Sequence, residues 1–148
     1  MARILVAEDD ALFLRAIHDT LELSGYSVCG VTNGARAIEV LGYFRPDLIV
    51  TDVMMPEMDG LELYCQVRRE SWGTAIPFMF ISARDAAYAV EQVARNNNAY
   101  FLKKPFGMEE LLEAVHKLLR GHKPSPASPA DLSAAGTSTS DLTLREVL

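Results

Sequence analysis

Short apolar runs alternate with amphipathic segments five times between residues 1 and 121. The apolar runs are typical of strands, and the segments between them repeat their apolar positions with a helical period. The predicted strands are Arg3–Ala7, Ser27–Val31, Asp47–Thr51, Ile76–Ser82 and Ala99–Lys103, and the predicted helices lie near Asp10–Ser24, Asn33–Tyr43, Gly60–Glu70, Asp85–Asn96 and Gly107–Gly121. Five successive strand–helix units predict an α/β fold built on a doubly wound parallel sheet.

Three of the predicted strands, at 4–7, 48–50 and 78–81, are apolar without alternation. This pattern is typical of strands that helices cover on both faces. Gly25 and Gly121 follow the first and last predicted helices, where glycine commonly ends a helix. We therefore expect a flavodoxin-like (βα)5 sheet with strand order 2-1-3-4-5, in which strands one and three are neighbours.

The composition changes beyond Gly121. Sixteen of the 21 residues from 121 to 141 are Gly, Pro, Ser, Thr or Ala, which is too little apolar surface to offset the entropy lost on ordering. An amphipathic pattern then resumes. We expect 1–121 to form one domain, 122–141 to be a flexible Pro/Ser/Ala linker, and 142–148 to begin a truncated C-terminal effector domain.

Composition and charge exclude several classes of protein. A chain with 49% hydrophobic and 23% charged residues folds as a packed domain. Residues 1–121 carry 12 basic against 17 acidic residues, without a long basic run, so we expect no direct binding of nucleic acid. The N-terminus does not resemble a signal peptide, and no apolar stretch approaches the roughly 18 residues that span a bilayer. We expect a cytoplasmic protein without membrane contact.

The two cysteines, Cys29 and Cys65, lack the spacing of a redox motif or a metal site. Cys29 falls in a predicted strand and Cys65 on a predicted helix. We expect both to be buried, reduced thiols.

Polar side chains follow four of the predicted strands at the point where each strand ends. They are Glu8 and Asp9 after the first strand, Asp52 after the third, Ser82 after the fourth and Lys104 after the fifth. Because the carboxyl ends of parallel strands lie along one edge of the sheet, these side chains should converge there. Carboxylates, a hydroxyl and an ammonium at one edge make a phosphate-and-metal site.

Each of these residues also has a structural explanation. Asp9 or Asp10 alone could cap the first helix, Ser82 could cap the fourth, and Asp52 could be a turn residue. Lys104 could be a surface lysine. As a group they favour a functional site over these structural explanations, because clustered carboxylates repel one another unless they are protonated or bind a cation such as Mg²⁺.

That group of residues permits phosphoryl transfer onto a carboxylate. Asp52 would attack phosphorus and become an aspartyl phosphate, while Mg²⁺, Lys104 and the Ser82 hydroxyl would neutralise or bind the phosphoryl oxygens. The chain has no GxxxxGK[ST] loop for a nucleoside triphosphate. The phosphoryl donor must therefore come from elsewhere.

The motifs ILVAEDD (4–10), IVTDVMMPEMDG (49–60), FISA (80–83) and YFLKKPF (100–106) resemble those of the receiver domain of two-component response regulators. The resemblance covers residues 1 to about 121 and is specific in order, spacing and strand-end context. It implies that Asp52 is the phosphoacceptor. The phosphoryl group would come from a phosphohistidine on a sensor histidine kinase or a phosphotransfer protein.

The same resemblance implies a Mg²⁺ (or Mn²⁺) site at Asp52. Asp9 would bind the ion directly, Glu8 through water, and the backbone carbonyl of Met54 would complete the protein ligands with Asp52. Glu8 replaces the more frequent Asp, and its longer arm suits a contact through water.

The resemblance also implies a switch. Lys104 would pair with the phosphoryl group ahead of a cis Pro105, Ser82 would follow that group, and Phe101 would follow Ser82. Phe101 stands where Tyr is frequent, so switching must rest on packing rather than on a hydroxyl. By the same resemblance, Met54 and Arg84 would influence how fast the acyl phosphate is hydrolysed. Strand alternation should point Lys103 away from the site.

The tail carries a second resemblance. Leu142-Thr143-Leu144-Arg145-Glu146 is similar to the LTPRE opening of the helix-turn-helix domain in LuxR/NarL-type transcription regulators, with Leu144 where that motif has Pro. It implies that a DNA-binding domain, missing from this chain, would follow. DNA would then be bound through that domain.

The leading hypothesis is a signalling receiver that is not an enzyme, apart from catalysing its own phosphorylation and dephosphorylation. Its phosphorylated surface would control an effector domain, or a stand-alone receiver would dock on a partner protein. An alternative from another class is a Mg²⁺-dependent aspartyl-phosphate phosphatase of the haloacid dehalogenase type, which carries its nucleophile in a DxD motif after the first strand. A flavodoxin-like cofactor binder is disfavoured by the three acids after strand one.

Overall fold

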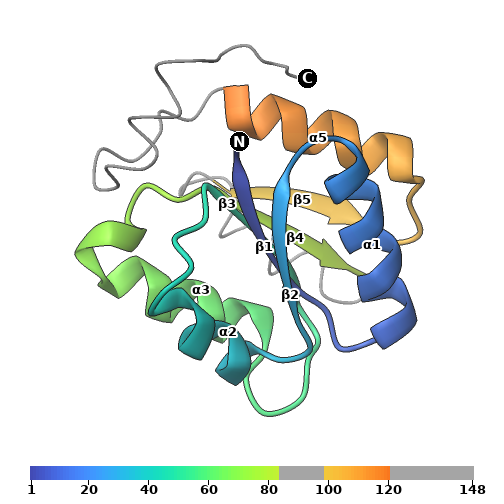
Figure 1. Cartoon of the computed structure of the whole chain (residues 1–148). Helices are drawn as coiled ribbons and strands as arrows, with labels where there is room; N and C mark the ends of the chain where they lie inside the picture. Colours follow the sequence, from blue (N-terminus) through green and yellow to red (C-terminus); the bar gives the residue numbers. More distant parts are fainter. Residues whose placement is uncertain (84–98, 121–148) are drawn as a thin grey trace.

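A five-stranded parallel sheet forms the centre of the computed structural model, which describes residues 1–83 and 99–120 (Figure 1). The strand order is β2-β1-β3-β4-β5, so the expected flavodoxin-like order is confirmed. The strands are β1 (Arg3–Ala7), β2 (Ser27–Val31), β3 (Leu48–Asp52), β4 (Phe78–Ser82) and β5 (Ala99–Lys103).

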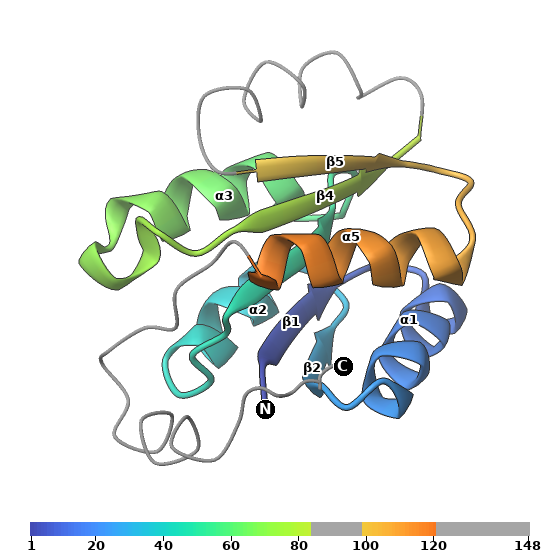
Figure 2. The ribbon, with the colours of Figure 1, turned by 90° about the horizontal axis from the view of Figure 1, so that it is seen from above.

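Helices cover both faces of the sheet (Figure 2). Helices α1 (Ala11–Leu23) and α5 (Met108–Arg120) lie on one face, and α2 (Gly34–Leu41) and α3 (Gly60–Arg69) lie on the other. A short 3-10 turn, η1 (Ser71–Gly73), follows α3. The helix expected near 85–96, the linker at 122–141 and the segment 142–148 lie outside the described residues.

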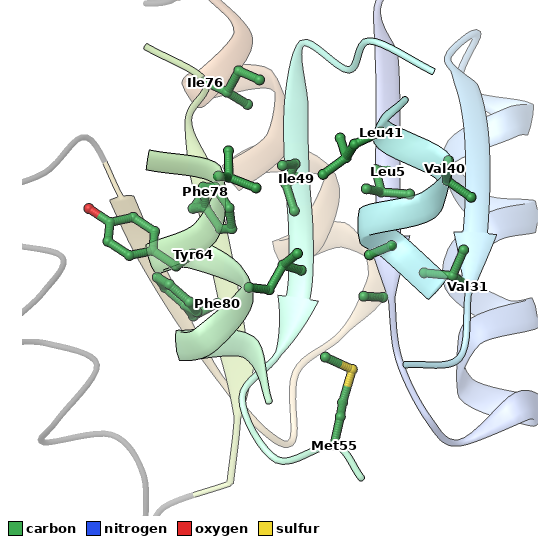
Figure 3. Packing of buried hydrophobic residues seen from close by; sticks show 14 of the residues in the cluster. Leu5, Val31, Val40, Leu41, Ile49, Met55, Tyr64, Ile76, Phe78 and Phe80 are labelled. Atoms are coloured by element: carbon green, nitrogen blue, oxygen red, sulfur yellow. The ribbon is translucent and has the colours of Figure 1, made fainter. Parts of the chain in front are cut away.

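The alternation of side chains along each strand divides the core into two clusters. On β1, Leu5 and Ala7 join the cluster under α2 and α3, whereas Ile4 and Val6 join the one under α1 and α5. Figure 3 shows the first cluster, in which Tyr64 of α3 packs edge-on against Phe78 with ring centroids 4.9 Å apart. Since all these strand residues are buried, the expectation of strands covered on both faces is confirmed.

Local chemistry sets where the elements begin and end. Asp10 caps α1, because its carboxylate accepts from the N–H groups of Leu12 and Phe13. Gly25, with φ of +98°, provides the left-handed turn after that helix. Strand β4 begins two residues later than predicted, since Pro77 has no N–H to donate to the sheet.

The expectation of two buried thiols is wrong. Both cysteines are free, Cys29 is half-buried and Cys65 is exposed. Cys65 directly follows the buried Tyr64 on α3 and therefore lies on the outward side of an amphipathic helix. Within residues 1–83 and 99–120, the helices are all too short or too polar to cross a membrane.

Candidate functional site

The carboxyl ends of the strands bring together the polar side chains singled out from the sequence. Glu8 directly follows β1, Asp52 ends β3, Ser82 ends β4 and Lys104 directly follows β5. Within the sheet, Asp52 pairs with Ile81 on β4, and Ser82 pairs with Lys103 on β5. Residues almost a hundred positions apart in the chain thus meet at one edge.

Lys104 joins the two buried carboxylates of this edge. Its Nζ donates to Glu8 Oε1 at 3.2 Å and to Asp52 Oδ2 at 3.1 Å. The side chains of Glu8 and Asp52 are 1% and 7% exposed, whereas that of Lys104 is 28% exposed. One ammonium therefore faces two largely desolvated acids from the open side of the site.

The surroundings shift the proton affinities of this group. Burial raises the pKa of Glu8 to about 7, the charge of Asp52 adds to that effect, and the Asp10 N–H and Lys104 oppose it. Burial alone would lower the pKa of Lys104, but the bonds and charges of Asp52 and Glu8 outweigh it and raise that pKa. The site therefore keeps Lys104 as a cation, whereas Glu8 titrates near neutral pH when no other cation is bound.

The three consecutive acids after β1 have different surroundings. Asp10 is the cap of α1, and its own N–H donates to Glu8 Oε2 at 3.0 Å. Asp9 is exposed, and one of its oxygens lies within 4.8 Å of oxygens of Glu8 and Asp52. The capping explanation therefore accounts for Asp10 alone.

The backbone around Asp52 is held closely. The N–H of Met54 donates to Asp52 Oδ1 at 3.2 Å, and the Thr51 hydroxyl donates to the Asp52 carbonyl at 2.9 Å. Gly60, at the start of α3, passes so near that a Cβ there would lie 2.3 Å from the same carbonyl oxygen. A side chain at position 60 would push the β3–α3 loop away from the site.

The remaining predicted residues lie around this centre. Ser82 is fully buried, its hydroxyl donates to the Ala83 carbonyl at 3.0 Å, and its carbonyl accepts from the N–H of Lys104 at 2.8 Å. The peptide bond between Lys104 and Pro105 is cis. Phe101 is half-buried against the cluster under α2 and α3, Lys103 is exposed, and Arg84 lies outside the described residues.

The donor set fits a magnesium ion. An octahedral Mg²⁺ with bonds of about 2.1 Å needs oxygens about 3 to 4 Å apart, and it keeps several waters. The carboxylate oxygens of Glu8, Asp9 and Asp52 that lie within 4.8 Å of one another come close to that spacing. Three carboxylates against one ammonium also leave a negative charge that a divalent cation would neutralise.

One neighbour of the site was missed by the sequence analysis. The ring of Phe13, on the first turn of α1, lies under Lys104 with 5.0 Å between its centroid and Nζ. The signal in the sequence is its position three residues after the helix cap Asp10, which places it on the turn of α1 nearest the edge.

The comparisons with known proteins decide the family. Residues 4–116 match the family model described as the response regulator receiver domain. The chain belongs to the receiver domain family. As in other receiver domains, its expected role is signalling in a two-component system rather than that of a classical enzyme.

The receiver has curated relatives and structural neighbours in several bacteria. It is 40% identical over 147 residues to response regulator MprA of Mycobacterium leprae, an alignment that covers 98% of this chain and 61% of that protein. The chain thus spans about three fifths of the length of these relatives. The receiver domain of a Syntrophus aciditrophicus histidine kinase has a TM-score of 0.76 and 31% identity, covering 86% of this chain and 97% of that one.

A second structural neighbour is the receiver domain of sensor histidine kinase PA1611 from Pseudomonas aeruginosa, described with a magnesium ion coordinated in the active site cleft. Its TM-score is 0.71 at 26% identity, and the match covers 80% of this receiver and 98% of that chain.

Proposed function

We propose that Asp52 accepts a phosphoryl group from a phosphohistidine of a sensor histidine kinase or a phosphotransfer protein. The observation that carries this proposal is the pair of bonds that orient the buried carboxylate, from the Met54 N–H to Oδ1 and from Lys104 Nζ to Oδ2. A carboxylate held in one orientation at the edge of the sheet is prepared for in-line attack on phosphorus.

The reaction exchanges one bond to phosphorus for another. A bond forms between an Asp52 oxygen and phosphorus, the bond between phosphorus and the histidine nitrogen breaks, and the leaving imidazole takes up a proton from solvent water. Lys104 moves from the Asp52 oxygen to a phosphoryl oxygen, and the Ser82 hydroxyl turns from the Ala83 carbonyl toward another. Hydrolysis of the acyl phosphate by water ends the cycle.

Magnesium is the cofactor that this donor set favours, and Mn²⁺ would satisfy the same oxygens. Asp9, Asp52 and the Met54 carbonyl would hold the ion directly, with Glu8 acting through water. The bound ion would neutralise charge on the phosphoryl oxygens. The magnesium-containing neighbour supports this assignment.

The switch rests on Ser82 and Phe101. Phosphorylation would draw Ser82 toward the phosphoryl group, and Phe101, on the neighbouring strand, would repack into the space that opens. Phe101 is half-buried, so this movement changes the exposed surface beside β5. Met54, which is 67% exposed, and Arg84 would set how fast water reaches the acyl phosphate.

This surface would control an effector. The greater length of the curated relatives leaves room for a further domain, joined through a linker at 122–141, with its start at 142–148. That domain would bind DNA, because residues 142–146 resemble the opening of a helix-turn-helix domain, whereas the acidic receiver itself disfavours DNA. Docking of a stand-alone receiver on a partner protein is the other output.

The test is incubation of the whole chain with Mg²⁺ and acetyl phosphate, followed by intact mass measurement of wild type, Asp52→Asn and Asp19→Asn. Asp19 is an exposed carboxylate on α1 and serves as the control. We expect one base-labile phosphoryl group on wild type and on the control, dependent on Mg²⁺, and none on Asp52→Asn. Equal labelling of Asp52→Asn would overturn the assignment.

A further inference from the structure

Phe13 is an aromatic neighbour of Lys104 outside the set of residues assigned above. The Lys104 ammonium lies 5.0 Å from the ring centroid, within the range of a cation–π interaction. The ring is half-buried and leans on Phe106, with centroids 5.6 Å apart and planes inclined by 56°. Packing on that side fixes the face that Phe13 presents to Lys104.

The first turn of α1 connects Phe13 to the other partner of Lys104. The Phe13 N–H donates to Asp10 Oδ1 at 3.2 Å, and the Asp10 N–H donates to Glu8 Oε2 at 3.0 Å. The second oxygen of Glu8 accepts from Lys104 at 3.2 Å. The Glu8 carboxylate and the Phe13 ring are thus linked through the first turn of α1, and both contact the Lys104 ammonium.

We propose that Phe13 is a positioning residue that keeps Lys104 over the site during phosphoryl transfer. This inference rests on the proposed function. Lys104 must leave Asp52 when that carboxylate attacks phosphorus, and its bond to Glu8 weakens when a metal ion shares the acid. The ring is neutral, so neither the ion nor the phosphoryl group competes for it. It remains a partner of the ammonium while the carboxylates change theirs.

The experiment compares phosphorylation rates in Phe13 variants at saturating Mg²⁺ and acetyl phosphate, with Mg²⁺ affinity measured separately. Removal of the π face in Phe13→Leu should lower the maximal phosphorylation rate about fivefold. Mg²⁺ affinity should change less than about twofold, because the ion's ligands remain. Phe13→Trp, which has a stronger π face, should restore the rate. A pentafluorophenylalanine at position 13 keeps the shape of the ring but reverses its face charge, so it should behave like Phe13→Leu.

Phe44→Leu is the matched control, since Phe44 lies under Arg3 at 4.6 Å on the opposite edge of the sheet. It removes a similar contact and should leave the phosphorylation rate unchanged. A rate in the fluorinated protein equal to wild type would overturn the proposal, as would a loss of rate in Phe44→Leu as large as in Phe13→Leu. Absence of phosphorylation in wild type would instead refute the proposed function.

Discussion

The two edges of the sheet hold positive charge in different ways. At the carboxyl-end edge, Lys104 lies between the carboxylates of Glu8 and Asp52, in addition to its contact with the Phe13 ring. At the amino-end edge, the positive charges lie over neutral rings. The pairs are Arg3 with Phe44, Arg45 with Trp72 and Arg68 with Tyr64, at 4.6, 4.4 and 4.7 Å from guanidinium carbon to ring centroid.

Arg68 makes several of the contacts that stabilise the amino-end edge. Its Nη1 donates to the carbonyls of Gly73 and Ile76, both at 2.7 Å, and its guanidinium also lies 5.2 Å from the Phe78 ring. These partners are backbone oxygens and ring faces of the fold itself. They tie the end of α3 to the start of β4.

The difference lies in whether the partners can be exchanged. A ring or a neutral backbone carbonyl is a weaker ligand for a cation than a carboxylate is, so an arriving ion would leave the arginines in place. The carboxylates that hold Lys104 are better ligands for a metal ion, and the ammonium is a good partner for a phosphoryl group. The edge with exchangeable partners is therefore the one suited to chemistry, and the other is suited to stability.

The largest expected effect is the loss of Lys104. Lys104→Met should lower the rate of phosphorylation by acetyl phosphate about 100-fold or more, because one fixed charge on the phosphoryl oxygens disappears. The metal-free variant should also lose about 1 to 3 kcal/mol in the free energy of unfolding, since two buried acids then face each other without a cation. Intact mass measurements and urea unfolding with and without Mg²⁺ check these outcomes.

Lys103→Met is the control, because Lys103 is the exposed neighbour on β5. Both quantities should match wild type in that variant. Comparable losses at the two positions would mean that total charge matters and that the contacts of Lys104 do not.

The placement of the principal site residues could be predicted from the sequence because it follows from the sheet alone. In a parallel sheet, the residues after the strands converge whatever the details of the helices, which is why Glu8, Asp52 and Lys104 were expected to meet. The choice between Asp9 and Asp10 as helix cap requires the first residue of the helix to be known to within one position. Sequence patterns do not locate helix ends that accurately.

Phe13 could not have been placed in the same way. Its contact with Lys104 depends on how α1 is rotated over the sheet and on the path of the chain at Pro105. Both are results of tertiary packing. The exposure of Cys65, by contrast, follows from the helical spacing of Leu63, Tyr64 and Val67, which places position 65 on the outer side of α3.

The next prediction tests the amino-end edge. Arg68→Leu should lower the free energy of unfolding by about 2 to 3 kcal/mol, because two carbonyls lose a charged donor. The phosphorylation rate of the folded variant should stay close to wild type, since the partners of Arg68 lie away from Asp52. Arg69→Leu, at an exposed position next along α3, should cost less than about 0.5 kcal/mol. A large fall in the phosphorylation rate of Arg68→Leu would show that the two edges are coupled.

The last prediction concerns a difference in sign between two titrating groups. A single proton changes the free energy of unfolding by at most about 1.4 kcal/mol per pH unit. Glu8 at the carboxyl-end edge has a pKa raised from 4.5 to about 7. The metal-free folded state therefore holds this proton more tightly than the unfolded chain does. The stability from Glu8 is full below pH 4.5 and is lost as the pH rises through about 7.

His116 of α5 behaves in the opposite way. Burial and the charge of Arg120 lower the pKa of His116 from 6.5, and its Nδ1 lies 2.6 Å from the Tyr26 hydroxyl oxygen. The neutral His116 therefore contributes its whole stabilisation of the fold above pH 6.5. This contribution is lost as the pH falls through the lowered pKa. Urea unfolding in EDTA between about pH 5 and pH 8 should check both signs. The free energy of unfolding of Glu8→Gln relative to wild type should increase as the pH rises, and that of His116→Gln should increase as the pH falls. If the relative stability of both variants changed in the same direction with pH, the pKa of one of these groups would not be shifted as its burial implies.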